Sequence, residues 1–253
     1  MNSKWKKLII VGVILLVVAL VVAILVMVLK EDTQIGPTPP PVITPVGEKS
    51  PAEKILVNPY SITNASKNRD IRTSIPKLIN LDDSRFQEYM NKKMLQTVLD
   101  YQNEIEVMID EDTLATTLYK YVTSYEKYAN DIYLSLVVSN DYQTGGMRSN
   151  SWKDTYNIDV TKGANREIFL KDLFTAETDY ESEILKVINA KAKATGYELV
   201  GGNGLSSLPE TQKFYIKEGK LIIYFDPAAI APYVYGELNF EMPFEYVNGK
   251  FKI

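Results

Sequence analysis

Residues 116–161 read TTLYKYVTSYEKYANDIYLSLVVSNDYQTGGMRSNSWKDTYNIDVT, and this segment carries the clearest indication of the fold. It contains three segments rich in Tyr, Val, Ile and Thr, which are Thr116 to Ser124, Ile132 to Ser139 and Trp152 to Thr161. Residues of these types favour strands, and short turn segments between strands join neighbours that run in opposite directions. The pattern therefore predicts an antiparallel meander of three strands.

Two amphipathic segments flank the meander and predict helices. Before it, Asp82 and Asp83 precede apolar residues spaced three and four apart, namely Phe86, Met90, Met94, Leu95, Val98, Tyr101 and Ile105. This spacing puts the apolar residues on one face of a long helix with an acidic start. After the meander, a second helix is predicted from about Thr178 to Ala194, beginning at Asp179 and ending at Gly196.

Shorter segments complete the predicted order. Asp70 to Asn80 alternates apolar and polar residues around Pro76, which indicates an edge strand. Lys213 to Ile216 and Leu221 to Phe225 predict a hairpin, and further strands are expected near 236–241 and 250–253. Strand, helix, several strands, helix and several strands predict an α+β fold, with antiparallel sheets and two main helices.

The N-terminal segment predicts a membrane anchor. From Leu8 to Leu29 the chain runs 22 residues without a charge. At about 1.5 Å per residue, such a helix crosses a hydrocarbon core of about 30 Å. Three lysines precede the run, whereas Glu31 and Asp32 follow it closely, so we expect the N-terminus inside the cell and the remainder outside. The apolar run is longer than that of a secretory signal and ends in Met27, Val28, Leu29 and Lys30, which favours an uncleaved signal anchor.

The expected organisation has five parts. Residues 1–7 form a cytoplasmic stub, 8–29 the transmembrane anchor, and 30–53 an extended linker with six of the twelve prolines. A smaller α+β domain is expected over 54–140 and a second one over 141–253. Because no Pro-rich or Gly-rich linker separates these two, we expect them to pack together.

Composition excludes several classes of function. The chain has no Cys and no His, which rules out disulfides, thiolate metal sites and catalytic triads that use imidazole. Of the 28 lysines and arginines, three precede the anchor, which leaves 25 against 32 acidic residues and a net charge near −7 outside. A surface of this sign is unsuited to nucleic acid. No cofactor is expected, since Gly201-Gly202-Asn203-Gly204 lacks the Lys and Ser/Thr of a phosphate loop.

Carboxylates and tyrosines remain as candidate functional groups. Asp110, Glu111 and Asp112 form an acidic run without calcium-loop spacing, which we interpret as a solvated turn. Tyrosine is abundant, with 17 in the chain, and five gather between residues 119 and 133. Amphipathic rings suit binding surfaces, but packing in a half-buried sheet explains this cluster equally well.

A glycine loop joins two strands of the meander. Residues 142–152, YQTGGMRSNSW, combine two glycines, an arginine and aromatic borders. Such a loop can present backbone groups and Arg148 to a ligand, and a plain hairpin connection with glycine at positive φ is an equally good interpretation.

Four segments in order resemble the RsiV-type extracellular family, also described as domain of unknown function 3298. They are Tyr142-Gln-Thr-Gly-Gly-Met-Arg148, Tyr156-Asn-Ile-Asp-Val-Thr-Lys-Gly163, Phe169-Leu-Lys-Asp-Leu-Phe174 and Phe225-Asp-Pro-Ala-Ala-Ile-Ala-Pro-Tyr-Val-Tyr-Gly236. The resemblance implies an extracytoplasmic α+β domain of Gram-positive bacteria, as in lysozyme-sensing anti-sigma factors and in front of peptidoglycan deacetylases. A smaller domain often precedes it and would correspond to about residues 54–140.

The chain departs from the family's best-known members in three ways. Seven residues before Leu8 are too few to hold a sigma factor, and no histidine is present to bind a deacetylase metal. The family's glycine loop also commonly has His where this chain has Arg148.

We therefore expect a membrane-anchored, non-enzymatic module of the cell envelope that binds a lysozyme-like protein or peptidoglycan. The expected ligand-binding residues come from the two motifs that carry the resemblance: Tyr142, Gly145, Gly146, Arg148, Trp152, Tyr233 and Tyr235. One alternative is an anti-sigma-like regulator that signals envelope stress through its transmembrane segment. Another is an enzyme on cell-wall glycans that uses two carboxylates alone.

Overall fold

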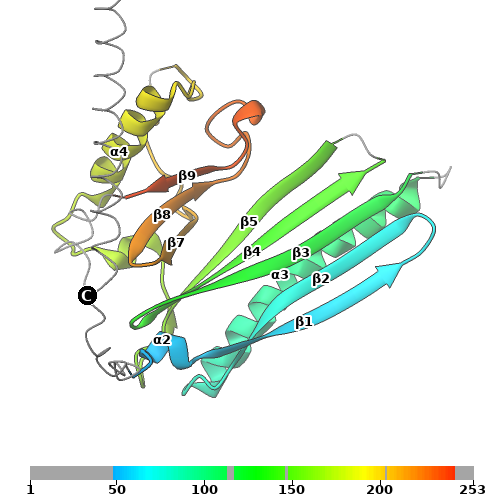
Figure 1. Ribbon diagram of the computed structural model, residues 1–253, viewed down its shortest axis with the longest axis horizontal. Helices are drawn as coiled ribbons and strands as arrows, with labels where there is room; N and C mark the ends of the chain where they lie inside the picture. Colours follow the sequence, from blue (N-terminus) through cyan, green and yellow to red (C-terminus); the bar gives the residue numbers. More distant parts are fainter. Residues whose placement is uncertain (1–47, 113–116, 146–147, 203, 243–253) are drawn as a thin grey trace, which may run out of the picture. The chain divides into compact units, whose positions relative to one another are not determined.

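The computed structural model describes residues 48–112, 117–145, 148–202 and 204–242 (Figure 1). Lys49–Ile253 form one compact unit, to which every element below belongs. None of the helices within the described ranges is long and apolar enough to cross a membrane. The predicted span from Leu8 to Leu29 lies outside these ranges, as does the strand expected at 250–253.

A six-stranded sheet forms the larger part of this unit, in the order β1-β2-β3-β4-β5-β6. Its strands are β1 (Leu56–Ala65), β2 (Arg69–Ile79), β3 (Tyr119–Asn130), β4 (Tyr133–Thr144), β5 (Arg148–Asp159) and β6 (Arg166–Glu167). A second sheet has three strands in the order β7-β8-β9, which are β7 (Phe214–Lys217), β8 (Lys220–Phe225) and β9 (Leu238–Glu241). The α+β class and the meander β3-β4-β5 are confirmed.

The prediction of antiparallel sheets is wrong at one pairing. Arg69–Arg72 of β2 run parallel to Tyr119–Val122 of β3, whereas the other pairs of described strands are antiparallel. The connection between β2 and β3 contains the helix α3 (Ser84–Glu111), which is long enough to return the chain to the starting end of the sheet.

The predicted edge strand is also wrong, because β1 pairs along the whole of β2 and takes the edge itself. Pro76 is still tolerated inside β2. It lies opposite Pro59 of β1, and pairing with β3 stops at Arg72, so no strand neighbour on that side needs its missing N–H.

Both main helices are confirmed, with the predicted caps. The Asp83 side chain accepts hydrogen bonds from the N–H groups of Arg85 and Phe86 at the start of α3. Helix α4 (Tyr180–Thr195) begins after Asp179 and ends at Gly196, whose φ of 75° is the left-handed conformation of a glycine C-cap. A short helix, α2 (Pro51–Lys54), occupies the end of the predicted linker, where Ala52 is fully buried. Two 3₁₀ turns, η1 (Leu170–Leu173) and η2 (Tyr233–Tyr235), complete the order.

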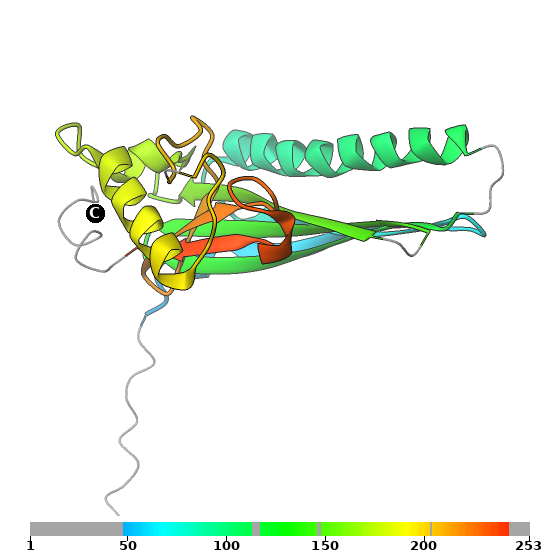
Figure 2. The same cartoon turned by 90° about the horizontal axis from the view of Figure 1, so that it is seen from above.

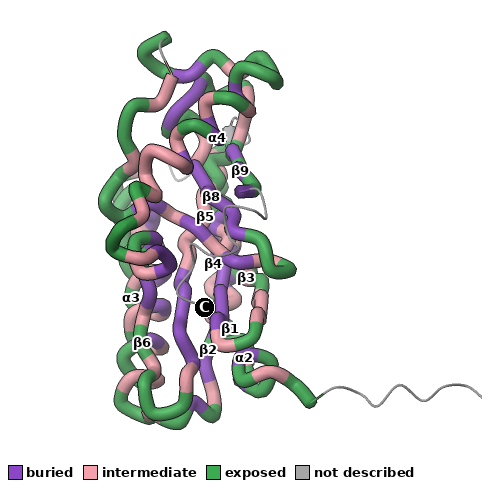
Figure 3. The backbone as a smooth tube through the Cα atoms, turned by 90° about the vertical axis from the view of Figure 1, so that its left-hand side faces the viewer, coloured by how far each residue is buried: buried purple, intermediate pink, exposed green. Residues whose placement is uncertain are grey.

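Two hydrophobic cores lie on opposite faces of the large sheet. Helix α3 runs along one face, as Figure 2 shows, and buries Met90, Met94 and Val98 against Leu134 and Leu136. The opposite face carries Tyr133, which packs in a second core with α4 and the small sheet. The buried segments of β4 are visible in Figure 3. The predicted domain boundary between residues 140 and 141 falls inside β4, which belongs to this one continuous sheet.

Polar side chains join β7 to the large sheet. The buried Asn157 donates from Nδ2 to the Phe214 carbonyl at 2.8 Å, and the Ile216 N–H donates to Ser135 Oγ at 2.9 Å. Ser135 in turn donates to Asn157 Oδ1 at 2.6 Å. These bonds supply the partners that a further strand would otherwise give to β7.

Candidate functional site

The end of the β4-β5 hairpin contains part of the predicted glycine loop. Thr144 pairs with Arg148 across the hairpin, and Gly145 has a φ of 54° and donates its N–H to the Leu118 carbonyl at 3.1 Å. Gly145 therefore ties the loop to the start of β3. Gly146 and the side chain of Arg148 lie outside the described part of the chain.

Tyr142 and Trp152 belong to the face of the sheet that α3 covers. The Tyr142 hydroxyl lies 3.2 Å from Sδ of Met108, in the last turns of α3. The Trp152 ring meets Tyr101 edge-on at 4.9 Å and stacks on Tyr121 at 6.4 Å between centroids. Trp152 is thus part of the packing beneath α3, and Tyr142 lies at the open end of that packing.

Tyr233 reaches the same hairpin from a distant part of the sequence. Its hydroxyl donates to the Ser149 carbonyl at 2.7 Å, while 47% of the residue stays exposed. Val234, the next residue, is 84% exposed. Tyr235 points elsewhere, since its ring packs 5.0 Å from that of Tyr197 and its hydroxyl contacts the Gly196 carbonyl at the end of α4. The structure therefore brings Tyr233 to the hairpin but not Tyr235.

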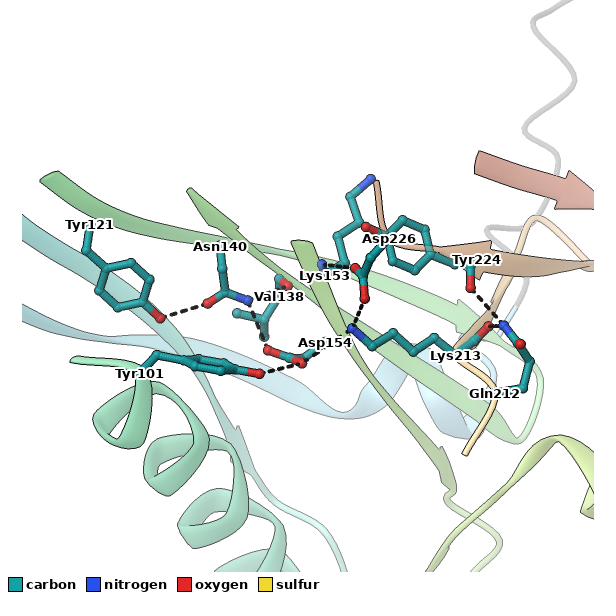
Figure 4. A network of polar contacts seen from close by, with 10 residues as sticks. All are labelled: Tyr101, Tyr121, Val138, Asn140, Lys153, Asp154, Gln212, Lys213, Tyr224 and Asp226. Atoms are coloured by element: carbon teal, nitrogen blue, oxygen red, sulfur yellow. Dashed lines mark hydrogen bonds and ion pairs between the residues drawn. The ribbon is translucent and has the colours of Figure 1, made fainter. Parts of the chain in front are cut away.

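A chain of polar side chains crosses the sheet from β3 through β4 to β5 (Figure 4). The Tyr121 hydroxyl donates to Asn140 Oδ1 at 2.8 Å, and Asn140 Nδ2 donates to Asp154 Oδ2 at 2.9 Å. Tyr101 donates to the other oxygen of Asp154 at 3.4 Å. Asp154 is thus held by side chains from α3 and β4.

The chain of contacts continues around the edge of β5 to the small sheet. Lys213 Nζ lies 3.9 Å from Asp154 Oδ1 and 2.6 Å from Asp226 Oδ2. The other oxygen of Asp226 accepts a hydrogen bond from the Lys153 N–H at 3.2 Å. The Lys153 ammonium pairs with Glu237 at 2.6 Å. One network of alternating charges therefore joins the two cores.

Residues 171–245 match the family model described as "Protein of unknown function (DUF3298)". The chain carries a DUF3298 domain. This domain supplies Lys213, Asp226 and Tyr233, whereas Ser149, Lys153 and Asp154 precede it in the sequence. The network thus connects the DUF3298 domain to the preceding sheet.

Solved structures of DUF3298 proteins share this fold. A member from Bacteroides fragilis NCTC 9343 superposes with a TM-score of 0.58 at 14% identity, covering 81% of this chain and 96% of that one. A DUF3298 family protein from Pseudomonas aeruginosa PAO1 gives a TM-score of 0.57 at 12% identity, covering 80% and 97%. None of the curated proteins matches the sequence. The shared fold includes the sheet before residue 171, since the coverage extends well beyond the matched domain.

Burial raises the pKa of Asp154 and of three tyrosines in or beside the network. It raises the pKa of Asp154, against the opposing effect of the nearby Lys213 ammonium. Burial, followed by the charge of Asp154, raises the pKa of Tyr101 to about 12. The pKa values of Tyr121 and Tyr224 also rise because both side chains are buried. Tyr101 and Tyr121 therefore stay neutral hydrogen-bond donors at physiological pH.

The tyrosine cluster and the acidic run do not form sites of their own. Tyr121 and Tyr133 are buried in the two different cores, so packing accounts for them. Asp110 and Glu111 complete the last turn of α3, and Asp112 caps it. Within the described ranges, no group of three acidic side chains is arranged to hold a metal ion.

Sequence reasoning missed Asp154, Lys213 and Asp226. The signal for Asp154 was present, because it occupies an inward-facing position of a strand between Trp152 and Tyr156, where an apolar residue is expected. Asp226 lies inside the quoted Phe225–Gly236 motif. Lys213 follows a loop and carries no local pattern that distinguishes it from a surface lysine.

Proposed function

We propose that this protein is a membrane-tethered, extracytoplasmic binding module of the RsiV type, without enzymatic activity. Its partner is a lysozyme-like protein or peptidoglycan, and the contact surface is the end of the β4-β5 hairpin with Tyr233 and Val234. The tether is the predicted span from Leu8 to Leu29, continued by the Pro-rich linker.

The observation that carries this proposal is an exposed aromatic side chain held in place by its own hydroxyl. Tyr233 is bound to the Ser149 carbonyl, yet about half of it remains exposed beside the almost fully exposed Val234. A tyrosine already fixed in position loses little conformational entropy on binding. Aromatic residues of this kind contribute strongly to protein interfaces.

The electrostatics of the network support a binding role over catalysis by two carboxylates. Such catalysis requires one carboxylic acid and one carboxylate beside the same bond. Here Asp154 and Asp226 both face the ammonium of Lys213, and Asp154 is further engaged by Asn140 and Tyr101. Through these contacts the two carboxylates join the two cores.

The test measures binding of the full-length chain in detergent micelles to immobilised lysozyme and to cell-wall sacculi. We expect binding to one of them, and a Tyr233→Ala/Val234→Ser variant should weaken it by about tenfold or more. Tyr60→Ala is a matched control, because Tyr60 is also 47% exposed but lies on β1. Absence of binding to both, or equal binding by the two variants, would contradict the proposal.

A further inference from the structure

A pocket of about 260 Å³, lined by apolar and charged side chains, lies beside the network, between α3, β5, β6, η1 and the segment before β7. Lys93 and Thr97 of α3 line one side. Asp154 and Glu167 line the sheet side, and Gln212 and Lys213 line the side next to the small sheet. The pocket is smaller than the range of about 300–1,000 Å³ typical of drug-sized ligands, so it fits one small ring.

Hydrogen-bonding groups in this pocket are fixed before any ligand arrives. Lys93 Nζ contacts both carboxylate oxygens of Glu167, at 2.6 and 2.8 Å. Lys213 is held between Asp226 and Asp154. Each of these two ammonium groups is therefore paired with a carboxylate, so donors lie beside acceptors, which suits hydroxyl groups that both donate and accept.

The charges disfavour an anion as the ligand. Two ammonium groups, from Lys93 and Lys213, are already paired with carboxylates, and Glu210 adds a further acidic side chain to the lining. An anion would meet this surplus of negative charge. A neutral ligand with several hydroxyls gains hydrogen bonds from the same groups without that repulsion.

An aromatic side chain lines the opening of the pocket. Phe169 belongs to the lining and is 47% exposed, so its ring lies at the rim, in front of η1. An exposed ring beside charged side chains can pack against the apolar face of a molecule whose other edges carry hydroxyls.

From this combination, we infer that the pocket binds a single neutral sugar ring of a glycan, with Phe169 against one face of the ring and Lys93, Glu167 and Thr97 at its hydroxyls. The inference rests on the proposed function only in naming the cell envelope as the source of the glycan. The pocket uses side chains distinct from Tyr233 and Val234.

The experiment is ligand-observed saturation-transfer NMR on the full-length chain in detergent micelles. The probes are the methyl glycosides of glucose and N-acetylglucosamine, with cyclohexanol as a ring that has a single hydroxyl. We expect transfer to at least one glycoside, and weaker transfer to cyclohexanol. Phe169→Ala should weaken glycoside binding by about fivefold. Lys93→Met, which keeps the aliphatic stem, should weaken it by about tenfold.

Tyr60→Ala again serves as the control, because Tyr60 and Phe169 have the same exposed fraction. Transfer to neither glycoside, equal transfer in all variants, or equal transfer to cyclohexanol would overturn the inference. A chain that binds lysozyme or sacculi through Tyr233 but neither glycoside contradicts only the sugar pocket. A chain that binds a glycoside but neither lysozyme nor sacculi contradicts only the proposed function.

Discussion

The two edges of the large sheet differ: β1 forms one edge, and at the other edge only Ile158 and Asp159 of β5 pair with the two-residue strand β6. At β5, groups from other elements take up the outward-facing backbone: Tyr233 binds the Ser149 carbonyl, Asp226 binds the Lys153 N–H, and the Ile168 N–H binds the Asn157 carbonyl. At β1, no second strand is paired among the described strands. Pro59 lies at its centre, opposite Pro76.

The two edges are therefore protected against pairing with further strands in different ways. A pair of facing prolines fits only a non-hydrogen-bonded position, so the missing N–H of Pro59 is on the free side of β1 and interrupts the row of donors there. Pro59 therefore blocks pairing of β1 with a further strand, without any need to cover β1. The β5 edge is instead covered by β6, Ile168 and the DUF3298 domain, and the candidate binding surface and the pocket lie there. Four substitutions and one pH series test this difference between the β1 and β5 edges.

The largest effect is expected from Asn157→Ala, which removes the link between β5 and β7. The substitution leaves the buried Phe214 carbonyl and Ser135 hydroxyl without their partner, at a cost of about 3 kcal/mol in unfolding free energy. Urea unfolding of the 49–253 fragment, which contains both cores and the single tryptophan Trp152, measures this cost. Asn239→Ala, on the exposed side of β9, should cost about 0.5 kcal/mol or less. Equal costs would show that the link adds nothing.

Asp226→Ala should have the next largest effect. It removes the acceptor of the Lys153 N–H and the closer partner of Lys213, and we expect a loss of about 2 kcal/mol. The same urea titration measures it, with Asp141→Ala, an exposed aspartate of β4, as the matched control. A loss no greater than that of the control would show that Asp226 does not stabilise the β5 edge.

Tyr233→Phe should cost about 1 kcal/mol, because it deletes one hydrogen bond and keeps the ring. Amide exchange near Ser149 should become faster in this variant, and exchange in β1 should not change. Unchanged exchange on both strands would mean that the hydroxyl does not hold the hairpin.

The pH dependence of stability should depend on Asp154, the buried carboxylate of β5. Burial raises its pKa in the folded state above the unfolded value of about 3.9. The folded chain then binds the Asp154 proton more tightly than the unfolded chain does. The stability that this proton contributes is complete below the unfolded pKa and is lost as the pH rises through the folded pKa. In Asp154→Asn, stability should fall less as the pH rises. Urea midpoints at several pH values from about 4 upward measure this change. The same slope in both proteins would contradict the assignment.

The smallest effect on stability is expected at the open edge. Pro59→Val restores a donor on the free side of β1 and should change the unfolding free energy by about 0.5 kcal/mol or less. It should, however, promote self-association, which sedimentation velocity detects as dimers or larger species. A variant that stays monomeric at high concentration would show that Pro59 does not protect this edge.

The sequence predicts the helices and the meander because their signals are local. The three-and-four spacing after Asp83 marks α3, and Glu218-Gly219-Lys220 marks the β7-β8 hairpin, where Glu218 and Gly219 both have positive φ. Strand β1 was missed, since Asn58 and Pro59 interrupt any alternation. The parallel pairing of β2 with β3 was missed as well, although the helix between them permits it.

The candidate site is less predictable because two of the contacts that hold the β5 edge involve backbone groups. Tyr233 and Asp226 lie in one motif, but their partners are the carbonyl of Ser149 and the N–H of Lys153, groups that every residue has. No side-chain pattern marks which of them are used. Tyr235 was predicted from the same motif, yet the 3₁₀ turn η2 directs it toward α4 instead.

The most direct test of the central claim, that the covered β5 edge is the functional edge, is hydrogen exchange on the full-length chain with and without lysozyme or solubilised peptidoglycan. We predict that the partner slows exchange in residues 148–153 and 229–236 and leaves β1 unchanged. Slower exchange confined to β1 would contradict this claim.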